Sequence, residues 1–445
     1  MKVQTITNRR NPILPLDIHL ADSEAHVMKD GTMYLYGSCD EKENQYCSTR
    51  YHIVETKDME TWNVYHDRFS AENLVWEKEV DVSQLLNIDL EHPTPFLKKV
   101  MNEDAEVAEM VENENQDKTP LLYAPDATYF DGKYYLFFCM VGGIEGVAES
   151  ESPIGPFRHA RMLPCKGIDP TVYIEGEKIY YFWGQFYLHG AELNKTFDAF
   201  VEETEKAEIL SEEEHFFHEG ASLRKIGNKY YLVFADIEHG KPTSLGYAIS
   251  DSIFGPYEYK GVIIDNEGCD PKTWNNHGSI ECFQGQWYVF YHRSSRNSRQ
   301  FRRLCIEPIT IFEDGTISMV KMTSQGIGGP FQLSEQIMGY QVCQMKGNVY
   351  IDQDEWYGEK LTNIQKNDEI CFRYFQVKEK IKGIYINCRG NAVIELFFNQ
   401  YKIGEYKLSD NQAYYPLSFS ECGIYEVTWK IREVDHFEIL LFQFY

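Results

Sequence analysis

The sequence lacks the features that mark several classes of protein. No C-x-x-C pair occurs among its 11 cysteines, and their number is odd, so neither a zinc cluster nor a regular disulfide framework is expected. No apolar run approaches the ~20 residues that span a membrane. The 43 Lys and Arg are outnumbered by 69 Asp and Glu, which gives a formal net charge of −26. Because phosphates would be repelled by such a surface, nucleic acids and membranes are not expected as partners.

The N-terminal segment also lacks the apolar core of a signal peptide. Residues 1–10 read MKVQTITNRR, which alternates polar and apolar residues and carries three basic side chains. We therefore expect a cytoplasmic protein with reduced thiols, or a secreted one if a signal peptide precedes this sequence.

Helical heptads are missing as well, whereas signals for β-strands are abundant. Aromatic residues make up 15% of the chain, and they cluster in short runs such as Tyr134–Phe138 and Tyr230–Phe234, which favour strands. An ionisable residue precedes each of five such runs by a similar distance. These five residues are Asp22, Asp126, Asp169, Glu219 and His277.

A longer internal repeat supports the same unit. Residues 148–157 read AESESPIGPF and residues 248–257 read AISDSIFGPY, so two units end in nearly the same way. Repeated β-units that bury their faces only against one another are typical of a propeller. We predict an all-β protein in which residues 1–325 form a five-bladed β-propeller.

The remaining chain is predicted to form a second domain. A linker follows the propeller at 325–330, where the sequence is QGIGGP. Short alternating strands over residues 331–445 then predict a β-sandwich.

One stretch departs from the repeat. Residues 70–120 are polar and rich in Asp and Glu, which is typical of a solvated insertion loop or short helix. The alternative interpretation is a lid that shapes the rim of the propeller.

Three of the repeated positions carry carboxylates that could act together. Asp22, Asp126 and Glu219 would converge on the propeller axis from three blades. Cleavage of a glycosidic bond needs one carboxyl that protonates the leaving oxygen and another that activates water. A third carboxyl nearby raises the pKa of the acid by like-charge repulsion.

The other polar positions are candidates for substrate binding. Asp169 is either a turn residue or part of the site, and His277 would hold a water or a cation such as Ca²⁺ at the axis. Arg302 and Arg303 are neighbours on a predicted strand, so one of them should face the pocket. The pattern does not decide which one.

Five ordered motifs within residues 10–320 together resemble glycoside hydrolase family 43. They are Ala21-Asp22-Ser23-Glu24-Ala25, Ala124-Pro125-Asp126-Ala127, Ile168-Asp169-Pro170, His218-Glu219-Gly220 and Asn276-His277-Gly278-Ser279-Ile280. The resemblance implies a five-bladed propeller that hydrolyses glycosides with inversion.

The resemblance also implies roles for the motif residues. By motif, Asp22 takes the place of the general base and Glu219 that of the general acid. Asp126 takes the place of the residue that orients the acid and adjusts its pKa. His277 matches an axial histidine, and the arginine pair resembles members acting on arabinoxylan. Two departures are Ser23, where Pro is common, and Tyr123, where Trp is common.

The C-terminal region, from Leu361 to Phe444, looks like carbohydrate-binding module family 6. Its usual aromatic clamp is not identifiable, although Trp356, Tyr357 and Trp429 are available. The domain either binds xylan or packs on the propeller and shapes its site.

The resulting expectation is an inverting exo-acting glycoside hydrolase. It would release α-L-arabinofuranosyl or β-D-xylosyl units from hemicellulose such as arabinoxylan oligosaccharides, with no required cofactor and with Ca²⁺ only as a structural ion. One alternative is a retaining propeller enzyme acting on sucrose or fructan. Its Arg-Asp-Pro motif is absent, since the two Asp-Pro pairs follow Ile168 and Cys269. The other is a non-catalytic carbohydrate-binding propeller, which would not need three converging carboxylates.

Overall fold

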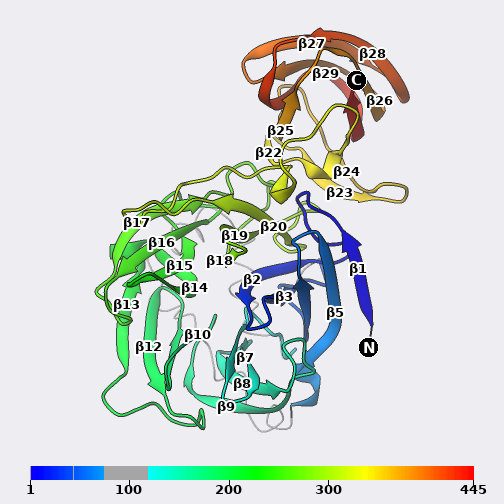
Figure 1. Cartoon of the computed structure of the whole chain (residues 1–445). Helices are drawn as coiled ribbons and strands as arrows, with labels where there is room; N and C mark the ends of the chain where they lie inside the picture. The colour runs from blue at the N-terminus through cyan, green and yellow to red at the C-terminus, as the bar shows by residue number, and fades with distance from the viewer. Residues whose placement is uncertain (1, 44, 75–118) are drawn as a thin grey trace.

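The computed structural model describes residues 2–43, 45–74 and 119–445 (Figure 1). Most of the predicted acidic insertion at 70–120 therefore lies outside the described residues. Within the described ranges, no helix has the length and apolar character needed to cross a membrane.

Five antiparallel sheets form the larger domain (Figure 1). The first has the order β1-β5-β4-β3-β2, and the second to fourth each contain four strands in sequence order. The fifth contains three. The strands are β1 (Val3–Thr7), β2 (Leu20–Val27), β3 (Met33–Cys39), β4 (Arg50–Thr56), β5 (Thr61–Ser70), β6 (Asp126–Phe130), β7 (Lys133–Met140), β8 (Ile144–Ser150), β9 (Arg158–Lys166), β10 (Thr171–Glu175), β11 (Lys178–Trp183), β12 (Tyr187–Leu193), β13 (Lys206–Ser211), β14 (Phe217–Ile226), β15 (Lys229–Asp236), β16 (Ser244–Ser250), β17 (Glu258–Ile264), β18 (Ser279–Phe283), β19 (Gln286–Arg293) and β20 (Arg303–Ile309).

The first strand of each unit is the innermost one. β2, β6, β10, β14 and β18 contact one another in a ring, and a parallel bridge between Ser23 and Gly278 joins the first sheet to the fifth. The five predicted ionisable residues lie within the first three residues of these strands or two residues before them. The predicted all-β fold with a five-bladed propeller is thus confirmed.

Aromatic side chains fill the space between neighbouring blades. Tyr36 and Phe69 of the first blade pack with Leu136 and Phe138 of the second, and the rings of Phe69 and Phe138 lie 4.6 Å apart. The repeated Gly-Pro-aromatic ends also have equivalent places, between β8 and β9 and between β16 and β17. In both copies the glycine has a positive φ, which explains the residue type.

The N-terminal segment completes the fifth blade. The backbone N–H of Ile13 donates to the carbonyl of Leu304 at 3.0 Å. The side chain of Asn11 donates to the carbonyl of Ile306 at 3.2 Å and accepts from the backbone N–H of the same residue at 2.9 Å. The buried amide therefore replaces a strand partner for β20.

The second domain is one curled sheet of nine strands rather than two separate sheets. β26 and β29 are long enough to bend and to pair over most of their length, so the layers expected of a sandwich are parts of one sheet. The strands are β21 (Gln336–Met338), β22 (Gln344–Lys346), β23 (Tyr350–Asp354), β24 (Gly358–Thr362), β25 (Glu369–Val377), β26 (Ile381–Phe398), β27 (Tyr401–Leu408), β28 (Asn411–Phe419) and β29 (Gly423–Phe444).

The interval between β20 and β21 contains the predicted domain boundary at 325–331. Within it, η4 (Gly326–Gly328) lies against the N-terminal segment, because the backbone N–H of Gly328 donates to the carbonyl of Arg9 at 2.9 Å. Few other helical turns are described: η1 (Ala71–Asn73), α3 (Glu212–His215) and η5 (Gly339–Gln341).

A buried carboxyl in the second blade has no cationic partner among the described residues. Glu145 on β8 is 1% exposed, and its Oε2 accepts hydrogen bonds from the Tyr181 hydroxyl and, at 3.7 Å, from the Cys165 thiol. Burial raises the pKa of Glu145 from 4.5 to about 8, despite these two hydrogen bonds. The folded protein therefore holds this proton over a range in which the unfolded chain releases it.

The raised pKa of Glu145 makes the stability of the protein depend on pH. Because the pKa is higher in the folded state, the protein loses stability as pH rises from about 4.5 to about 8. We expect Glu145→Gln, which mimics the neutral acid, to raise the melting temperature at pH 8 by a few °C and to change it much less at pH 5. The control is Glu149→Gln on the same strand, where the carboxylate binds Lys133 at 2.8 Å. Equal effects of Glu145→Gln at both pH values would contradict the assignment.

Candidate active site

Asp22 is turned into the centre of the propeller by a bulge in β2. The pairing of β2 with β3 shifts between Ala21 and Glu24, and Asp22 has a φ of 53°. Bulges of this kind redirect a side chain at the rim of a sheet. The backbone N–H of Asp22 donates to Nδ1 of His292 at 3.2 Å, so the local conformation is held by a buried imidazole.

A buried arginine binds the Asp22 carboxylate. Arg302 Nη1 donates to Oδ1 at 2.8 Å and to Oδ2 at 3.1 Å. Burial by itself would raise the pKa of Asp22, but Arg302, followed by His277 and His292, lowers it to about 2. Asp22 is therefore an ionised carboxylate at any pH near neutrality.

The other side of the same guanidinium binds Asp40. Arg302 Nε and Nη2 each donate to Asp40 at 2.9 Å, and the backbone N–H of Arg302 donates to Oδ2 at 3.0 Å. The guanidinium carbon also lies 4.9 Å from the centre of the Tyr46 ring. With its donors engaged by two carboxylates, Arg302 orients Asp22 rather than offering donors to a ligand.

Arg303 points away from this centre. Its Nη1 binds the carboxylate of Glu359 in the second domain, and the two side chains are 3% and 1% exposed. Successive residues of a strand face opposite sides, so only one of the pair faces the site, as expected. That residue is Arg302, and the expectation that Arg303 contacts substrate does not agree with this placement.

Glu219 lies on an irregular part of β14. The pairing of β14 with β15 shifts on both sides of Glu219, and Gln185 Nε2 donates to its Oε2 at 2.8 Å. The next residue, Gly220, has a φ of 69°, and a Cβ there would lie 2.6 Å from the His277 ring. Glycine at this position therefore lets the carboxyl and the imidazole approach.

Asp169 joins the same centre through His277. The imidazole Nδ1 of His277 lies 3.6 Å from Asp22 Oδ1 and 3.7 Å from Asp169 Oδ2. Burial raises the pKa of Asp169 well above its usual range, and the negative charges of Glu219 and then Asp22 raise it further. Burial lowers the pKa of His277 against the opposing effects of Asp22 and Glu219, so the imidazole is neutral near pH 7.

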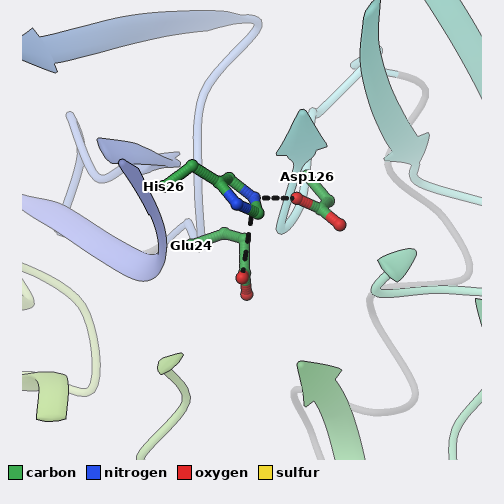
Figure 2. A group of neighbouring side chains, drawn as sticks. All are labelled: Glu24, His26 and Asp126. Atoms are coloured by element: carbon green, nitrogen blue, oxygen red, sulfur yellow. Dashed lines mark hydrogen bonds and ion pairs between the residues drawn. The ribbon is translucent and has the colours of Figure 1, made fainter. Parts of the chain in front are cut away.

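Asp126 has different neighbours. Its Oδ1 binds His26 Nε2 at 2.7 Å, and its Oδ2 accepts from the backbone N–H of Val172 at 2.7 Å and from the Thr171 hydroxyl at 3.2 Å. Figure 2 shows His26 between Asp126 and Glu24. The carboxyl expected to adjust the general acid is thus engaged by blade-to-blade contacts, whereas Asp169 carries the electrostatic coupling to Glu219.

The Glu24, His26 and Asp126 group is the one set of side chains within the described residues whose spacing could hold a metal ion. Its oxygens are already occupied by donors. Glu24 Oε1 accepts from Arg224 Nη2 at 2.6 Å and from the Ser222 hydroxyl at 3.0 Å. Since Ca²⁺ takes six to eight oxygen ligands, the guanidinium next to Glu24 makes a poor fit for that ion and supplies the positive charge itself.

Three residues of the site were not found by sequence reasoning. Asp40, Tyr46 and Gln185 follow aromatic strand runs but have no counterpart in the repeated pattern. Asp40 stands directly after β3, as the first polar residue beyond a fully buried strand, and this position was the only available signal.

The contact between Gly220 and His277 can be tested by adding one methyl group. Gly220→Ala would place Cβ against the imidazole, and moving reacting groups by ~1 Å costs about 10²-fold in rate. The matched control is Gly227→Ala in the following turn, which has a φ of 61° and no atom within 4 Å of the added Cβ. It should cost about 1 kcal/mol of stability and leave kcat unchanged. Equal kcat in both variants would argue against the contact.

Comparison with known proteins adds an independent line of support. Residues 100–317 match the family described as "Glycosyl hydrolases family 43". A xylosidase/arabinosidase from Thermoclostridium stercorarium is 28% identical over 451 residues, covering 86% of each chain. Xylosidase/arabinosidase 43A from Humicola insolens is 29% identical over 358 residues, covering 68% of this chain and 96% of the relative.

Solved structures agree with the fold. An arabinoxylan arabinofuranohydrolase of Bacillus subtilis, crystallised with cellotetraose, aligns with a TM-score of 0.50 at 18% identity, over 98% of this chain and 97% of its own. A β-xylosidase/α-arabinofuranosidase from a compost metagenome, described as a calcium-free form with xylotriose, aligns with a TM-score of 0.51 at 24% identity, over 71% and 98%. With the five ordered motifs and the carboxylates gathered around His277, these matches show that the chain is similar to glycoside hydrolase family 43.

Proposed function

We propose that the protein is an inverting exo-glycosidase that releases pentose, as α-L-arabinofuranosyl or β-D-xylosyl units, from hemicellulose oligosaccharides. The observation that carries the proposal is the convergence of Asp22, Asp169 and Glu219 on the His277 imidazole. This arrangement places the ionised carboxylate of Asp22 near the carboxyl of Asp169, whose protonated form is favoured. Those are the two states that single-displacement hydrolysis of a glycoside requires.

Asp22 is the proposed general base. Its carboxylate is ionised because Arg302 lowers its pKa to about 2 against the effect of burial. An ionised carboxylate can accept a proton from water as the water attacks the anomeric carbon. Arg302 and the backbone bond to His292 fix its orientation, so the attacking water meets a base that does not rotate.

Glu219 is the proposed general acid, and Asp169 is the residue that supports it. We assign this supporting role to Asp169 rather than Asp126, because the pKa of Asp169 is raised by burial and by the charge of Glu219. The protonated form of Asp169 is therefore favoured beside Glu219, and Glu219, in the role of general acid, passes a proton to the leaving oxygen. Gln185 holds the Glu219 carboxyl in place through one hydrogen bond.

The substrate class rests on the relatives and on charge. Relatives of the chain are named xylosidases, arabinosidases or arabinoxylan arabinofuranohydrolases. A net charge of −26 also favours a neutral ligand over an anionic one. Hydrolysis by two carboxyls and water requires no cofactor. A Ca²⁺ ion held by His277 through water would have a structural role.

The experiment that tests the function follows the anomeric protons of the sugar released from arabinoxylan oligosaccharides by proton NMR from the first minutes. Free arabinose or xylose should appear first as the inverted anomer, because water attacks directly. First release of the retained anomer would contradict the role of Asp22 and favour the retaining alternative. No release of sugar would favour the carbohydrate-binding alternative. Glu219→Gln is the control and should release almost none from these poor leaving groups.

Matched substitutions can show whether Asp169 or Asp126 is the residue that supports the general acid Glu219. We expect Asp169→Asn to lower kcat for unactivated xylosides by at least about tenfold, because the carboxyl that supports Glu219 is removed. Asp126→Asn should act mainly on stability, since its hydrogen bonds join blades. Melting temperature and kcat are measured for both. A larger kcat loss in the folded Asp126→Asn variant would restore the role predicted for it from the motif.

A further inference from the structure

The junction between the two domains lies one residue away from the active site. Arg302 and Arg303 are adjacent at the start of β20, and their Cα atoms are necessarily ~3.8 Å apart. The head of Arg302 lies between Asp22 and Asp40, whereas the head of Arg303 is bound by Glu359 on β24. A displacement of either side chain therefore moves the backbone of the other.

The pair formed by Arg303 and Glu359 is buried as completely as the site itself. The side chains are 3% and 1% exposed, and a residual cavity of only about 10 Å³ lies beside Arg303, between Asp270 and Ile351. Removing one partner of a buried ion pair leaves a charge without compensation. We therefore expect an unpaired Arg303 to move toward solvent or toward another acceptor.

The segment that leads to Arg302 is tied to the same hairpin of the second domain. The backbone N–H of Arg296 donates to the carbonyl of Ile351 on β23 at 2.6 Å. Asp270 Oδ2 accepts from the backbone N–H groups of both Asn297 and Ile351, at 3.3 Å and 3.2 Å. The hairpin of β23 and β24 thus holds residues 296–303 at two points, before and directly after Arg302.

We propose that Glu359 of the second domain is a positioning residue for catalysis, which holds Arg303 and thereby sets the place of Arg302 against the Asp22 carboxylate. The second domain is then part of the catalytic unit, regardless of whether it binds sugar. This inference rests on the proposed function, because Asp22 acts as the base only there. Glu359 itself touches neither Asp22 nor the other site residues, so its effect is transmitted through the backbone of β20.

The test compares Glu359→Ala with Glu426→Ala in the full chain. Glu426 also joins the domains, since it binds Arg373 at 3.0 Å and Lys321 at 2.9 Å, but it has no contact with β20. For Glu359→Ala we expect kcat to fall by about 10²-fold, as for a ~1 Å displacement of a reacting group, with KM nearly unchanged. Glu426→Ala should lower the melting temperature and leave kcat at the wild-type value.

Two further readouts separate positioning from general destabilisation. Water attack is part of every turnover, so the kcat loss in Glu359→Ala should be similar for aryl glycosides with good and with poor leaving groups. Glu359→Gln keeps a hydrogen-bond acceptor for Arg303 and should recover part of kcat. If Glu359→Ala does not fold, Glu359→Gln is measured alone and is expected to retain KM but lose kcat.

The outcomes that test the positioning role of Glu359 are distinct from those that test the proposed hydrolase activity. Wild-type kcat in folded Glu359→Ala or Glu359→Gln, while the wild-type protein is active, would overturn the positioning role alone. Equal losses of kcat in folded Glu359→Ala and Glu426→Ala would do the same, because any weakening of the junction would then suffice. An inactive wild-type protein would instead reject the proposed function.

Discussion

The structure depends on one buried guanidinium. Arg302 lies between two carboxylates from the first blade, Asp22 and Asp40, although all three side chains are almost fully buried. Without it the two carboxylates would repel each other and would also repel Asp169 and Glu219. Its fixed fork of donors satisfies both acids in defined orientations. The position of the Asp22 carboxylate is therefore set by an ion pair between the first blade and the residue that precedes the last strand of the fifth.

The propeller brings together ionisable side chains from five separate sheets. Every blade supplies ionisable groups from its innermost strand or from the residues just before it, and the pKa values of these groups differ because their neighbours differ. Asp22 is ionised by its arginine, whereas Asp169 is protonated through burial and the nearby charge of Glu219. Arg224 from the fourth blade also binds Glu24 from the first blade and Glu281 from the fifth.

The fold could be predicted from the sequence because its signals are local and repeated. Aromatic runs, Gly-Pro-aromatic ends and one ionisable residue per unit are enough to count the blades. The position of each side chain within the site could not be predicted in the same way. Asp126 is the first residue of β6, whereas Asp169 lies two residues before β10. The backbone N–H of Val172 in the next blade binds Asp126, while Asp169 faces His277. Such differences depend on contacts between distant strands, which a repeat pattern does not contain. Likewise, the sequence indicates that one of the neighbours Arg302 and Arg303 faces the site, because successive strand residues point to opposite sides. Which of them faces away is shown only by the ion pair of Arg303 with Glu359 in the other domain.

The way the ring is closed has a consequence for how the chain folds. Asn11 completes the edge of β20 through partners such as Ile306 and Glu307, about 295 positions later in the sequence. Contacts of such high sequence separation form slowly, because a long loop must close first. During synthesis, residues 11–13 lack their partners on β20 until nearly the whole propeller has been made. The same contact that makes the ring continuous thus leaves an open β edge through most of translation, when pairing with another chain is the competing outcome.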